Sequence, residues 1–434
     1  MSILFTNVTV LTMDGSRTPL RDAYVLVEGE KIAYVGPQRP EGEFDRVLDC
    51  TGKVMLPGFV NAHTHIPMTL MRGYGGGHDL QSWLHDYIFP AEAKLDDRAV
   101  EAGTDLGLAE MIATGVTCIA DMYMRTGVIA QRVVQAGLSA NLSCGGVYFG
   151  AAEDFAPERC GDCRNQQVLT EGWHMANNGQ IRVDASIHAE YTSNAPLWQW
   201  MAQYAADHGQ RMHVHVSETV AEHEASLARN GATPMQTLAK YGVWDNGGIA
   251  AHCVYTTAED WELMKRKDVA CVHNPWSNLK LGSGIAPVAD MKRAGVAVAL
   301  GSDGMSSHNC ADLFSDMKLT AALACGSSRD PLALGAWDVL EMATVQGARA
   351  LGRTDTGVVA AGMLADLILL DFTAPNLTPC HDPAENAVYS ANPSNVVMNM
   401  ARGQVIYENG VYHTIDLERV RTEVDGYALP LLFG

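Results

Sequence analysis

The sequence predicts an α/β protein: a (β/α)₈ TIM barrel with a small β-sandwich built from the two ends of the chain. Eight short apolar runs alternate with helical periodicity between about Leu56 and Gly352, and both flanks show alternating short strands and turn residues. The chain has 434 residues, 47% of them hydrophobic, which is enough for a sizeable core. We therefore assign residues 1–56 and 356–434 to the sandwich and residues 57–355 to the barrel.

Each predicted barrel strand is a short β-branched or apolar run. In chain order the runs are Gly58–His63, Val116–Asp121, Ser139–Cys144, Arg182–His188, Arg211–His215, Gly248–His252, Val269–His273 and Val296–Ser302. Helical patterns lie between them at Ala99–Thr114, Pro196–His208, Met235–Tyr241, Ala258–Lys265 and Pro287–Ala294. Strands that alternate with helices imply right-handed parallel crossovers, so eight such units favour a closed barrel.

The flanking segments carry strand and turn signals without helical periodicity. Asp14-Gly15 and Thr51-Gly52 mark turns in residues 1–56. The C-terminal runs are Asp366–Leu370, Val396–Met400 and Gln404–Tyr407. We expect both flanks to be β-rich and to pair with each other.

Charge and hydropathy exclude several classes of partner. The 30 Lys and Arg against 50 Asp and Glu give a net charge of −20, so we expect no nucleic-acid partner. No apolar stretch approaches the roughly 20 residues of a membrane span, and the N-terminus does not resemble a secretion signal. We therefore expect a cytoplasmic protein with no membrane partner, whose ten cysteines are reduced thiols and which can form a homo-oligomer.

Polar residues at the strand ends are the candidates for chemistry, because this barrel gathers reacting groups at the carboxyl ends of its strands. Six histidines and one aspartate lie there: His63, His65, His188, His215, His252, His273 and Asp303. A single histidine at such a place is usually an ordinary packed side chain. Their accumulation at successive strand ends indicates a metal site instead.

The spacing of His63 and His65 supports a metal site. Residues two apart on a strand project from the same face, so both imidazoles can hold one divalent ion. Imidazole and carboxylate ligands suit zinc, and an incomplete protein shell leaves a position for water. We expect one Zn²⁺ per subunit, with Fe²⁺ or Mn²⁺ as alternatives. Strand position alone does not separate His252 from the ligands.

Glu218 lies three residues after His215, where the fifth strand turns into a loop over the barrel mouth. A carboxyl group in that loop could transfer protons. The alternative is an acid in the first turn of the following helix, where the helix dipole favours it.

Five motifs in this order resemble the amidohydrolase superfamily. They are VNAHTH (60–65), HVHVSE (213–218), AHCV (251–254), HNP with SNLKLG (273–282) and GSDG (301–304). Within that superfamily they resemble the branch of 5′-methylthioadenosine/S-adenosylhomocysteine deaminases and related chlorohydrolases. The resemblance extends to the C-terminal segment ARGQVIYENG and so covers nearly the whole chain.

The resemblance implies a role for each candidate. The metal ligands would be His63, His65, His215 and Asp303. His252 would orient and polarise the attacking water, Asp303 would take its proton, and Glu218 would protonate the ring nitrogen beside the attacked carbon. His273 would then be structural, because the ligand set is complete without it.

Two further residues match the adenosine-type deaminases. By resemblance, Glu92 would accept hydrogen bonds from ribose hydroxyls and His188 would lie near the nucleoside. The alternative for Glu92 is a solvated acid at a helix start. Trp83 is spaced from Leu80 and Tyr87 by three and four residues, which favours an apolar helical face over a base-stacking role.

The segment after the third strand departs from the family pattern. Relatives that bind homocysteine carry arginines there, whereas residues 143–150 read SCGGVYFG and the next arginines are Arg159 and Arg164. This favours uncharged nucleosides over S-adenosylhomocysteine. Cys160 and Cys163 form a single CxxC, which we interpret as incidental thiols in an exposed loop.

The sequence therefore predicts a zinc-dependent deaminase of an adenine nucleoside, either adenosine, 5′-deoxyadenosine or 5′-methylthioadenosine. The alternative is an amidohydrolase acting on another amino- or halo-substituted heterocycle, such as guanine, a pterin or an s-triazine. A metal-free scaffold protein is a third hypothesis. The complete set of histidine and carboxylate candidates argues against it.

Overall fold

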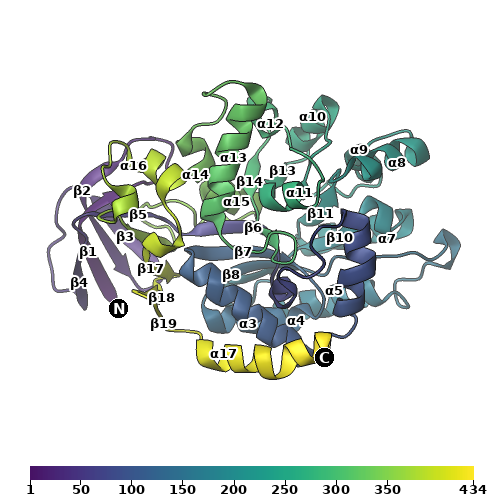
Figure 1. Ribbon diagram of the computed structural model, residues 1–434, viewed down its shortest axis with the longest axis horizontal. Helices are drawn as coiled ribbons and strands as arrows, with labels where there is room; N and C mark the ends of the chain where they lie inside the picture. The colour runs from purple at the N-terminus through teal and green to yellow at the C-terminus, as the bar shows by residue number, and fades with distance from the viewer.

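The computed structural model describes residues 1–434 and contains three β-sheets flanked by helices (Figure 1). One five-stranded sheet has the order β15 (Asp303–Gly304), β6 (Phe59–His65), β7 (Val116–Met122), β8 (Ser139–Ser143) and β9 (Ile181–Val183). A second has the order β10 (Ala185–Ala189), β11 (Met212–Val216), β12 (Gly248–His252), β13 (Val269–His273) and β14 (Val298–Leu300). All neighbouring strands in both sheets are parallel.

The fourth predicted strand is divided into two pieces, and the eighth is followed by a separate short strand. Only Asp184 separates β9 from β10, and two residues separate β14 from β15. At both breaks a buried side chain adds a hydrogen bond to those of the backbone, in which the Asp184 amide donates to Leu142 and the Gly301 amide donates to His273 (3.0 Å each). The Asp184 carboxylate accepts a hydrogen bond from Asn141 (2.8 Å), and Asn61 Oδ1 accepts one from the Ser302 amide (2.9 Å). The boundaries of the other six strands match the prediction to within two residues.

The five helices predicted between the strands are confirmed. They are α3 (Asp97–Ala113), α7 (Ala195–His208), α9 (Pro234–Lys240), α10 (Ala258–Arg266) and α12 (Val288–Arg293). Further helices are α4 (Thr126–Ala136), α5 (Gly161–Trp173), α8 (Val220–Asn230), α11 (Pro275–Lys280), α13 (Leu313–Ser328), α14 (Ala336–Ala343) and α15 (Val345–Ala350). Several begin at a capping side chain; for example, Asp96 accepts a hydrogen bond from the Ala99 amide (2.8 Å).

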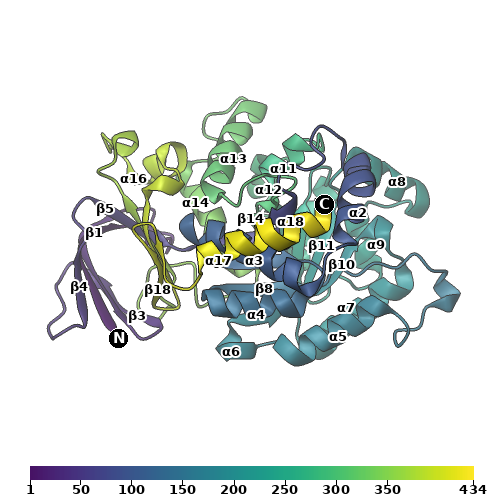
Figure 2. The same ribbon diagram turned by 60° about the horizontal axis from the view of Figure 1, so that its bottom comes forward.

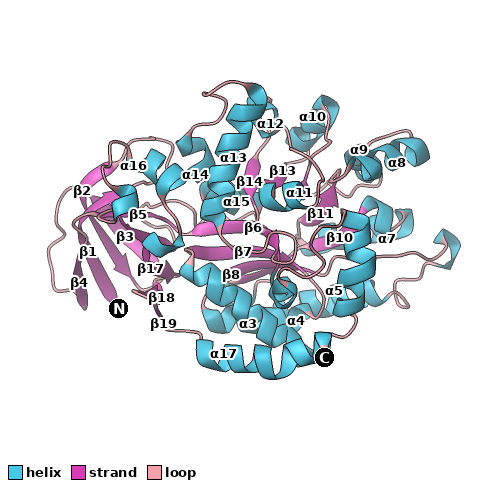
Figure 3. Ribbon diagram, viewed as in Figure 1, coloured by secondary structure: helices cyan, strands magenta, loops and turns pink.

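The two ends of the chain pair with each other, as predicted, in one mixed nine-stranded sheet (Figure 3, left). Its N-terminal strands are β1 (Ser2–Val10), β2 (Leu20–Glu28), β3 (Lys31–Gly36), β4 (Arg46–Asp49) and β5 (Lys53–Pro57). Its C-terminal strands are β16 (Leu367–Asp371), β17 (Val396–Ala401), β18 (Gln404–Glu408) and β19 (Val411–Tyr412). Antiparallel pairing of β5 with β16 joins the two sets. Strands from both ends share one cluster of 16 buried apolar residues.

The prediction that residues 356–434 are β-rich throughout is wrong at the C-terminus. Residues 417–433 are helical, from α17 (Leu417–Glu423) to α18 (Leu429–Phe433), and lie along α3 (Figure 2). The Asp416 side chain caps the segment by accepting from the Arg419 amide (3.0 Å). Four buried residues at intervals of four form its apolar stripe: Val420, Val424, Ala428 and Leu432. None of the helices in the chain combines the length and apolar character needed to cross a membrane.

Candidate active site

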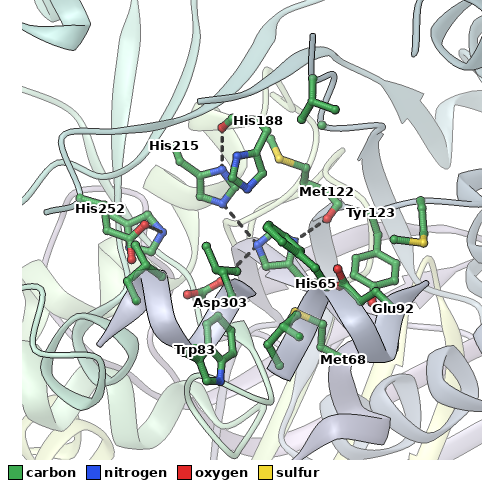
Figure 4. Close-up of a pocket in the computed structure, with 18 of the residues that line it drawn as sticks. His65, Met68, Trp83, Glu92, Met122, Tyr123, His188, His215, His252 and Asp303 are labelled. Atoms are coloured by element: carbon green, nitrogen blue, oxygen red, sulfur yellow. Dashed lines mark hydrogen bonds and ion pairs between the residues drawn. The ribbon is translucent and has the colours of Figure 1, made fainter. Parts of the chain in front are cut away.

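A cavity of about 310 Å³ lies at the carboxyl ends of the parallel strands (Figure 4). Seven of the predicted site residues line it: His65, Glu92, His188, His215, Glu218, His252 and Asp303. His63 is fully buried just beneath, within contact of Asp303. The parallel strands thus bring together side chains that lie up to 240 positions apart in the sequence.

The four predicted metal ligands converge in this cavity. Asp303 Oδ1 lies 3.3 Å from His65 Nε2 and 3.5 Å from His63 Nε2. The Nε2 atoms of His215 and His65 are 3.3 Å apart. His252 also approaches, because its ring, His63 and His215 can place one ligand atom each within 4.8 Å of one another. His252 therefore lies close to the proposed metal ligands, and its position does not separate it from them in the structure any more than in the sequence.

Hydrogen bonds hold the rings of His65 and His215 with Nε2 facing inward. The Nδ1 of His65 donates to the carbonyl of Met122, and the Nδ1 of His215 donates to the carbonyl of His188 (2.7 Å). In neutral rings bonded this way, both Nε2 atoms carry lone pairs. Two lone pairs 3.3 Å apart repel each other unless a proton or a cation lies between them.

His63 is oriented in a similar way by a histidine that the sequence analysis did not assign. His63 Nδ1 lies 2.7 Å from His213 Nε2, and His213 Nδ1 lies 3.2 Å from the Ser143 hydroxyl. His63 Nε2 is buried and has no hydrogen-bond partner within the protein. A buried polar atom without a partner is costly, and coordination of a cation would satisfy it.

Electrostatics favour neutral rings at His63 and His215 and a protonated ring at His65, whose proton a bound cation would replace. Burial lowers the pKa of His63 to about 3 and holds the pKa of His215 well below its ordinary value. Burial alone would also lower the pKa of His65, but Asp303 and the Met122 carbonyl outweigh it and raise the pKa to about 9. Three inward ring nitrogens and one carboxylate are ligands that suit a divalent transition metal.

Three hydrogen bonds hold the Asp303 carboxylate in place. The hydroxyls of Ser277 (2.5 Å) and Ser307 (3.1 Å) donate to Oδ2, and the amide of Gly304 donates to Oδ1 (2.8 Å). Ser277 is the first residue of the SNLKLG motif and lies in α11, whereas Ser307 lies in the turn after β15. No role was assigned to either serine from the sequence, because the contact with Asp303 depends on the tertiary fold.

Glu218 is buried beside the cluster and lies before the helix that follows. Helix α8 begins after Thr219, and the acid in its first turn is Glu222, whose carboxylate accepts from the Ser217 and Glu218 amides (2.8 and 2.7 Å). The helix-dipole alternative therefore applies to Glu222. Burial raises the pKa of the Glu218 carboxyl. A carboxyl group with a raised pKa is suited to donating a proton near neutral pH.

His252 faces Glu218 across the cavity, with its Nε2 3.8 Å from Glu218 Oε2. Its Nδ1 lies 2.8 Å from Asn278 Oδ1, which accepts a hydrogen bond and orients the ring. His252 (φ 74°) and Asp303 (φ 61°) both adopt left-handed backbone conformations. Such strain in residues other than glycine is concentrated at functional sites.

Glu92 and His188 line other walls of the same cavity. Glu92, in α2 (Phe89–Glu92), lines the cavity together with Tyr123, and burial raises the pKa of its carboxyl. It therefore faces the cavity and not bulk solvent. His188 Nδ1 lies 3.2 Å from the Thr192 hydroxyl, and burial lowers the His188 pKa to about 4.

Trp83 is buried in the apolar core with Leu80, as its spacing predicted, and it also lines the cavity. It lies in η2 (Trp83–Ile88) and lines the cavity together with Leu80 (Figure 4). Tyr87 does not line the cavity, and its ring packs against Tyr74 with centroids 5.6 Å apart. The apolar helical face that we predicted is thus divided, and part of it forms a cavity wall.

The remaining candidates lie outside the cavity. Arg159 and Arg164 are exposed and do not line it. Cys160 and Cys163 are buried at the start of α5, so the prediction of an exposed loop is wrong. His273 is buried away from the cavity, and burial lowers its pKa to about 3.

Comparisons with known proteins agree with this arrangement. The sequence profile of the amidohydrolase family matches residues 54–406. A 5-methylthioadenosine/S-adenosylhomocysteine deaminase of Acetivibrio thermocellus is 37% identical, with all of both chains covered. A 5′-deoxyadenosine deaminase of Methanosarcina acetivorans is 39% identical over 97% of this chain and 96% of its own.

A solved structure shares nearly the whole fold. It is an adenosine deaminase from Xanthomonas campestris with bound zinc, with a TM-score of 0.93 and 30% identity over 99% of this chain and 98% of its own. The family profile covers well over half of the chain, and the relatives match it from end to end. The chain therefore belongs to the amidohydrolase family.

Proposed function

We propose that the protein is a zinc-dependent hydrolytic deaminase of an adenine nucleoside. The observation that carries the proposal is the convergence of three inward imidazole nitrogens, the Asp303 carboxylate and the buried Glu218 carboxyl in one cavity. Relatives named as deaminases of 5′-deoxyadenosine, of adenosine and of 5-methylthioadenosine support the substrate class. The reaction consumes one water and yields ammonia and the inosine analogue.

In this proposal the metal is held by His63, His65, His215 and Asp303. A zinc ion bound there would supply the Lewis acidity that makes water a nucleophile near neutral pH. The serine hydroxyls on Asp303 Oδ2 keep the carboxylate positioned to accept a proton from that water. His252, oriented by Asn278, presents Nε2 toward the same region of the cavity.

Glu218 is the proton donor of the proposed reaction. Its raised pKa keeps a proton available, which the carboxyl donates to the ring nitrogen N1 beside the attacked carbon C6. Loss of the 6-amino group then needs a further proton, for which Asp303 and Glu218 are the carboxyl groups at hand. The Ser283 hydroxyl lies 3.4 Å from Glu218 Oε1 and helps to orient it.

The other cavity walls would hold the nucleoside. We assign Glu92 to the ribose hydroxyls, because a carboxylate can accept hydrogen bonds from two adjacent hydroxyls. His188 lies close to the proposed metal ligand His215, with ring centroids 4.7 Å apart, and would contact the nucleoside beside the reacting centre. Trp83 adds an aromatic surface to the wall.

The proposal extends to the architecture that supports the site. The near-continuity of β9 with β10 and of β14 with β15 favours one closed eight-stranded barrel made from the two parallel sheets. The apolar cluster shared by both chain ends favours a sandwich folded from the nine-stranded sheet. Their boundaries would lie near residues 56 and 356.

The test is ammonia release by zinc-loaded protein, with chelator-treated protein as the control. The panel contains adenosine, 5′-deoxyadenosine, 5′-methylthioadenosine, S-adenosylhomocysteine, guanine and cytosine. We expect turnover of the nucleosides, slower turnover of S-adenosylhomocysteine, and loss of activity on chelation that zinc restores. Iron and manganese reloading identifies the preferred metal. If the metal-loaded protein released no ammonia from any nucleoside, the proposal would be contradicted, and another amino- or halo-substituted heterocycle would be favoured as the substrate.

The variant Glu92→Gln tests the ribose assignment. We expect kcat/KM for 5′-deoxyadenosine to fall about tenfold, because charge-assisted hydrogen bonds to both hydroxyls are weakened. The effect should largely vanish with 2′,3′-dideoxyadenosine, which has no vicinal hydroxyls. An equal loss on both substrates would show that Glu92 acts elsewhere.

A further inference from the structure

One wall of the cavity carries a carboxylate that the proposed reaction does not use. Asp162 lies in the first turn of α5 and lines the cavity with Met124, Cys144 and Val147. Its Oδ2 accepts a hydrogen bond from the Val147 amide (2.8 Å), and Asn165 Nδ2 lies 3.4 Å from its Oδ1. These bonds tie the carboxylate to the loop after β8, so its position in the wall is set by the fold.

No cation balances this carboxylate. Neither lysine nor arginine lines the cavity, and Asp162 forms no ion pair. Arg159, the nearest arginine before it in the sequence, is exposed and lies within 3.4 Å of the Asp154 carbonyl oxygen. The cavity is therefore lined by carboxyl groups and by no lysine or arginine; the carboxyl groups are those of Glu92, Asp162, Glu218 and Asp303.

The position of Asp162 indicates which part of a substrate it meets. The reacting end of the cavity is formed by the histidines and by Glu218 and Asp303. Glu92, assigned to the ribose, lines the cavity together with Tyr123, which follows β7. The part of the cavity wall that contains Asp162 lies at the end of the neighbouring strand β8, and Asp162 takes no part in the proposed reaction. The substituent at the 5′ position of a nucleoside is the group left to lie there.

We propose that Asp162 determines specificity at the 5′ end of the substrate, rejecting anionic substituents and favouring neutral or cationic ones. This inference rests on the proposed function. A carboxylate or phosphate on the substrate would meet a like charge in a partly buried wall, where water screens poorly and where no lysine or arginine lines the cavity. Met124 and Val147 provide apolar contact for a methyl or methylthio group.

The experiment compares three nucleosides whose 5′ substituents are thioethers of different charge. The neutral substrate is 5′-methylthioadenosine, the anion is 5′-carboxymethylthio-5′-deoxyadenosine, and the cation is 5′-(2-aminoethylthio)-5′-deoxyadenosine. With the zinc-loaded enzyme we expect the anion to have the lowest kcat/KM. In Asp162→Asn, which keeps an acceptor for the Val147 amide, we expect the anion to gain about tenfold and the cation to lose about tenfold. The neutral substrate should change less than twofold.

Two further variants make the result interpretable. Asp162→Glu keeps the charge and should keep the wild-type ranking even if the loop shifts slightly. Asp154→Asn removes an exposed carboxylate in the same segment that does not line the cavity, and it should change none of the three values. If Asp162→Asn folds poorly, Asp162→Ser provides the same loss of charge.

The outcomes separate this inference from the proposed function. Turnover of all three nucleosides with an unchanged ranking in the uncharged variants would overturn the role of Asp162 and leave the deaminase proposal intact. No turnover of any of the three by the zinc-loaded wild type would instead count against the deaminase proposal itself.

Discussion

The nine-stranded terminal sheet and the two parallel sheets are built from similar short strands but bury different chemistry. The terminal sheet covers its shared cluster with apolar side chains such as Phe5, Val25 and Leu369. In the parallel sheets, β11 is buried along its whole length and yet carries His213 and His215. In the terminal sheet, the buried side chains stabilise the fold. In the parallel sheets, some of the buried side chains are polar groups that the fold holds in position.

Strand direction explains the difference. Parallel strands run the same way, so their carboxyl ends meet at one edge, where buried polar residues can satisfy each other. Strands joined by hairpins alternate in direction, and their ends are distributed over turns at both edges. Left-handed conformations occur in both regions: at Ser217, His252 and Asp303 at or just after the ends of parallel strands, and at Asn7 and Asp22 within strands of the terminal sheet. We therefore expect substitutions in the terminal sheet to lower stability and substitutions of polar residues at the parallel strand ends to lower activity.

The largest expected effect is a loss of activity without a loss of stability. Glu218→Gln should lower kcat for adenine nucleosides about 10³-fold, or about 4 kcal/mol, because the amide cannot donate the carboxyl proton. Bound zinc and the melting temperature should stay close to wild type, measured by metal analysis and calorimetry. Glu224→Gln, an exposed change on α8, is the matched control. Retained turnover in Glu218→Gln would remove Glu218 from the mechanism.

The second-largest effect is the converse, a loss of stability without a loss of catalytic activity. Phe5→Ala removes a large side chain that is fully buried in the terminal cluster and should cost about 3 kcal/mol in the free energy of unfolding. The folded fraction should keep its wild-type kcat, because no cavity residue touches this cluster. Val47→Ala, at a half-exposed position of β4, should change stability by less than about 0.5 kcal/mol. A fall in kcat that exceeds the loss of folded protein would show that the two regions are coupled.

The smallest effect concerns a buried pair next to the site. His308 Nε2 lies 3.0 Å from Asp316 Oδ2. Burial alone would lower the pKa of His308, but Asp316 outweighs it and raises the pKa to about 10. A raised histidine pKa contributes stability that is present below about pH 6.5 and is lost as the pH rises to about 10.

We therefore expect the free energy of unfolding to decline by about 1 kcal/mol across that pH range, since desolvation of Asp316 offsets part of the gain. Denaturant titrations at several pH values measure the decline. It should be absent from the double variant His308→Asn with Asp316→Asn. A similar decline in the double variant would assign the effect to other groups.

The recurrence of strand and helix patterns was sufficient to locate the strands and the site. Runs such as Gly248–His252 and Val269–His273 match the structure residue for residue, because buried parallel strands are short, apolar and bounded by turns. The sequence also predicted that the polar residues at the strand ends lie close together, because the carboxyl ends of parallel strands meet at one edge; these residues include His65, His215, His252 and Asp303. The C-terminal helix was missed, although the spacing of four from Val420 to Leu432 is a helical signal.

Other parts of the site had no signal in the sequence. Ser277 reaches Asp303 from α11 and Ser307 reaches it from the turn after β15, and Trp83 contributes to the cavity wall. Asp162 lies in the CxxC segment from Cys160 to Cys163, to which no function was assigned from the sequence. Loop paths depend on the packing of distant elements, so local spacing does not encode which loop residues reach a cavity.

The sequence by itself determined the alternation of strands and helices, the set of metal-type ligands and the family resemblance, because these depend on periodicity and on residue type at strand ends. Tertiary structure alone decided that His213 orients His63, that Asn278 orients His252 and that no cation faces Asp162. These relations join residues far apart in the chain. Their distances are set by how the sheets and loops pack in space, and local sequence patterns do not specify that packing.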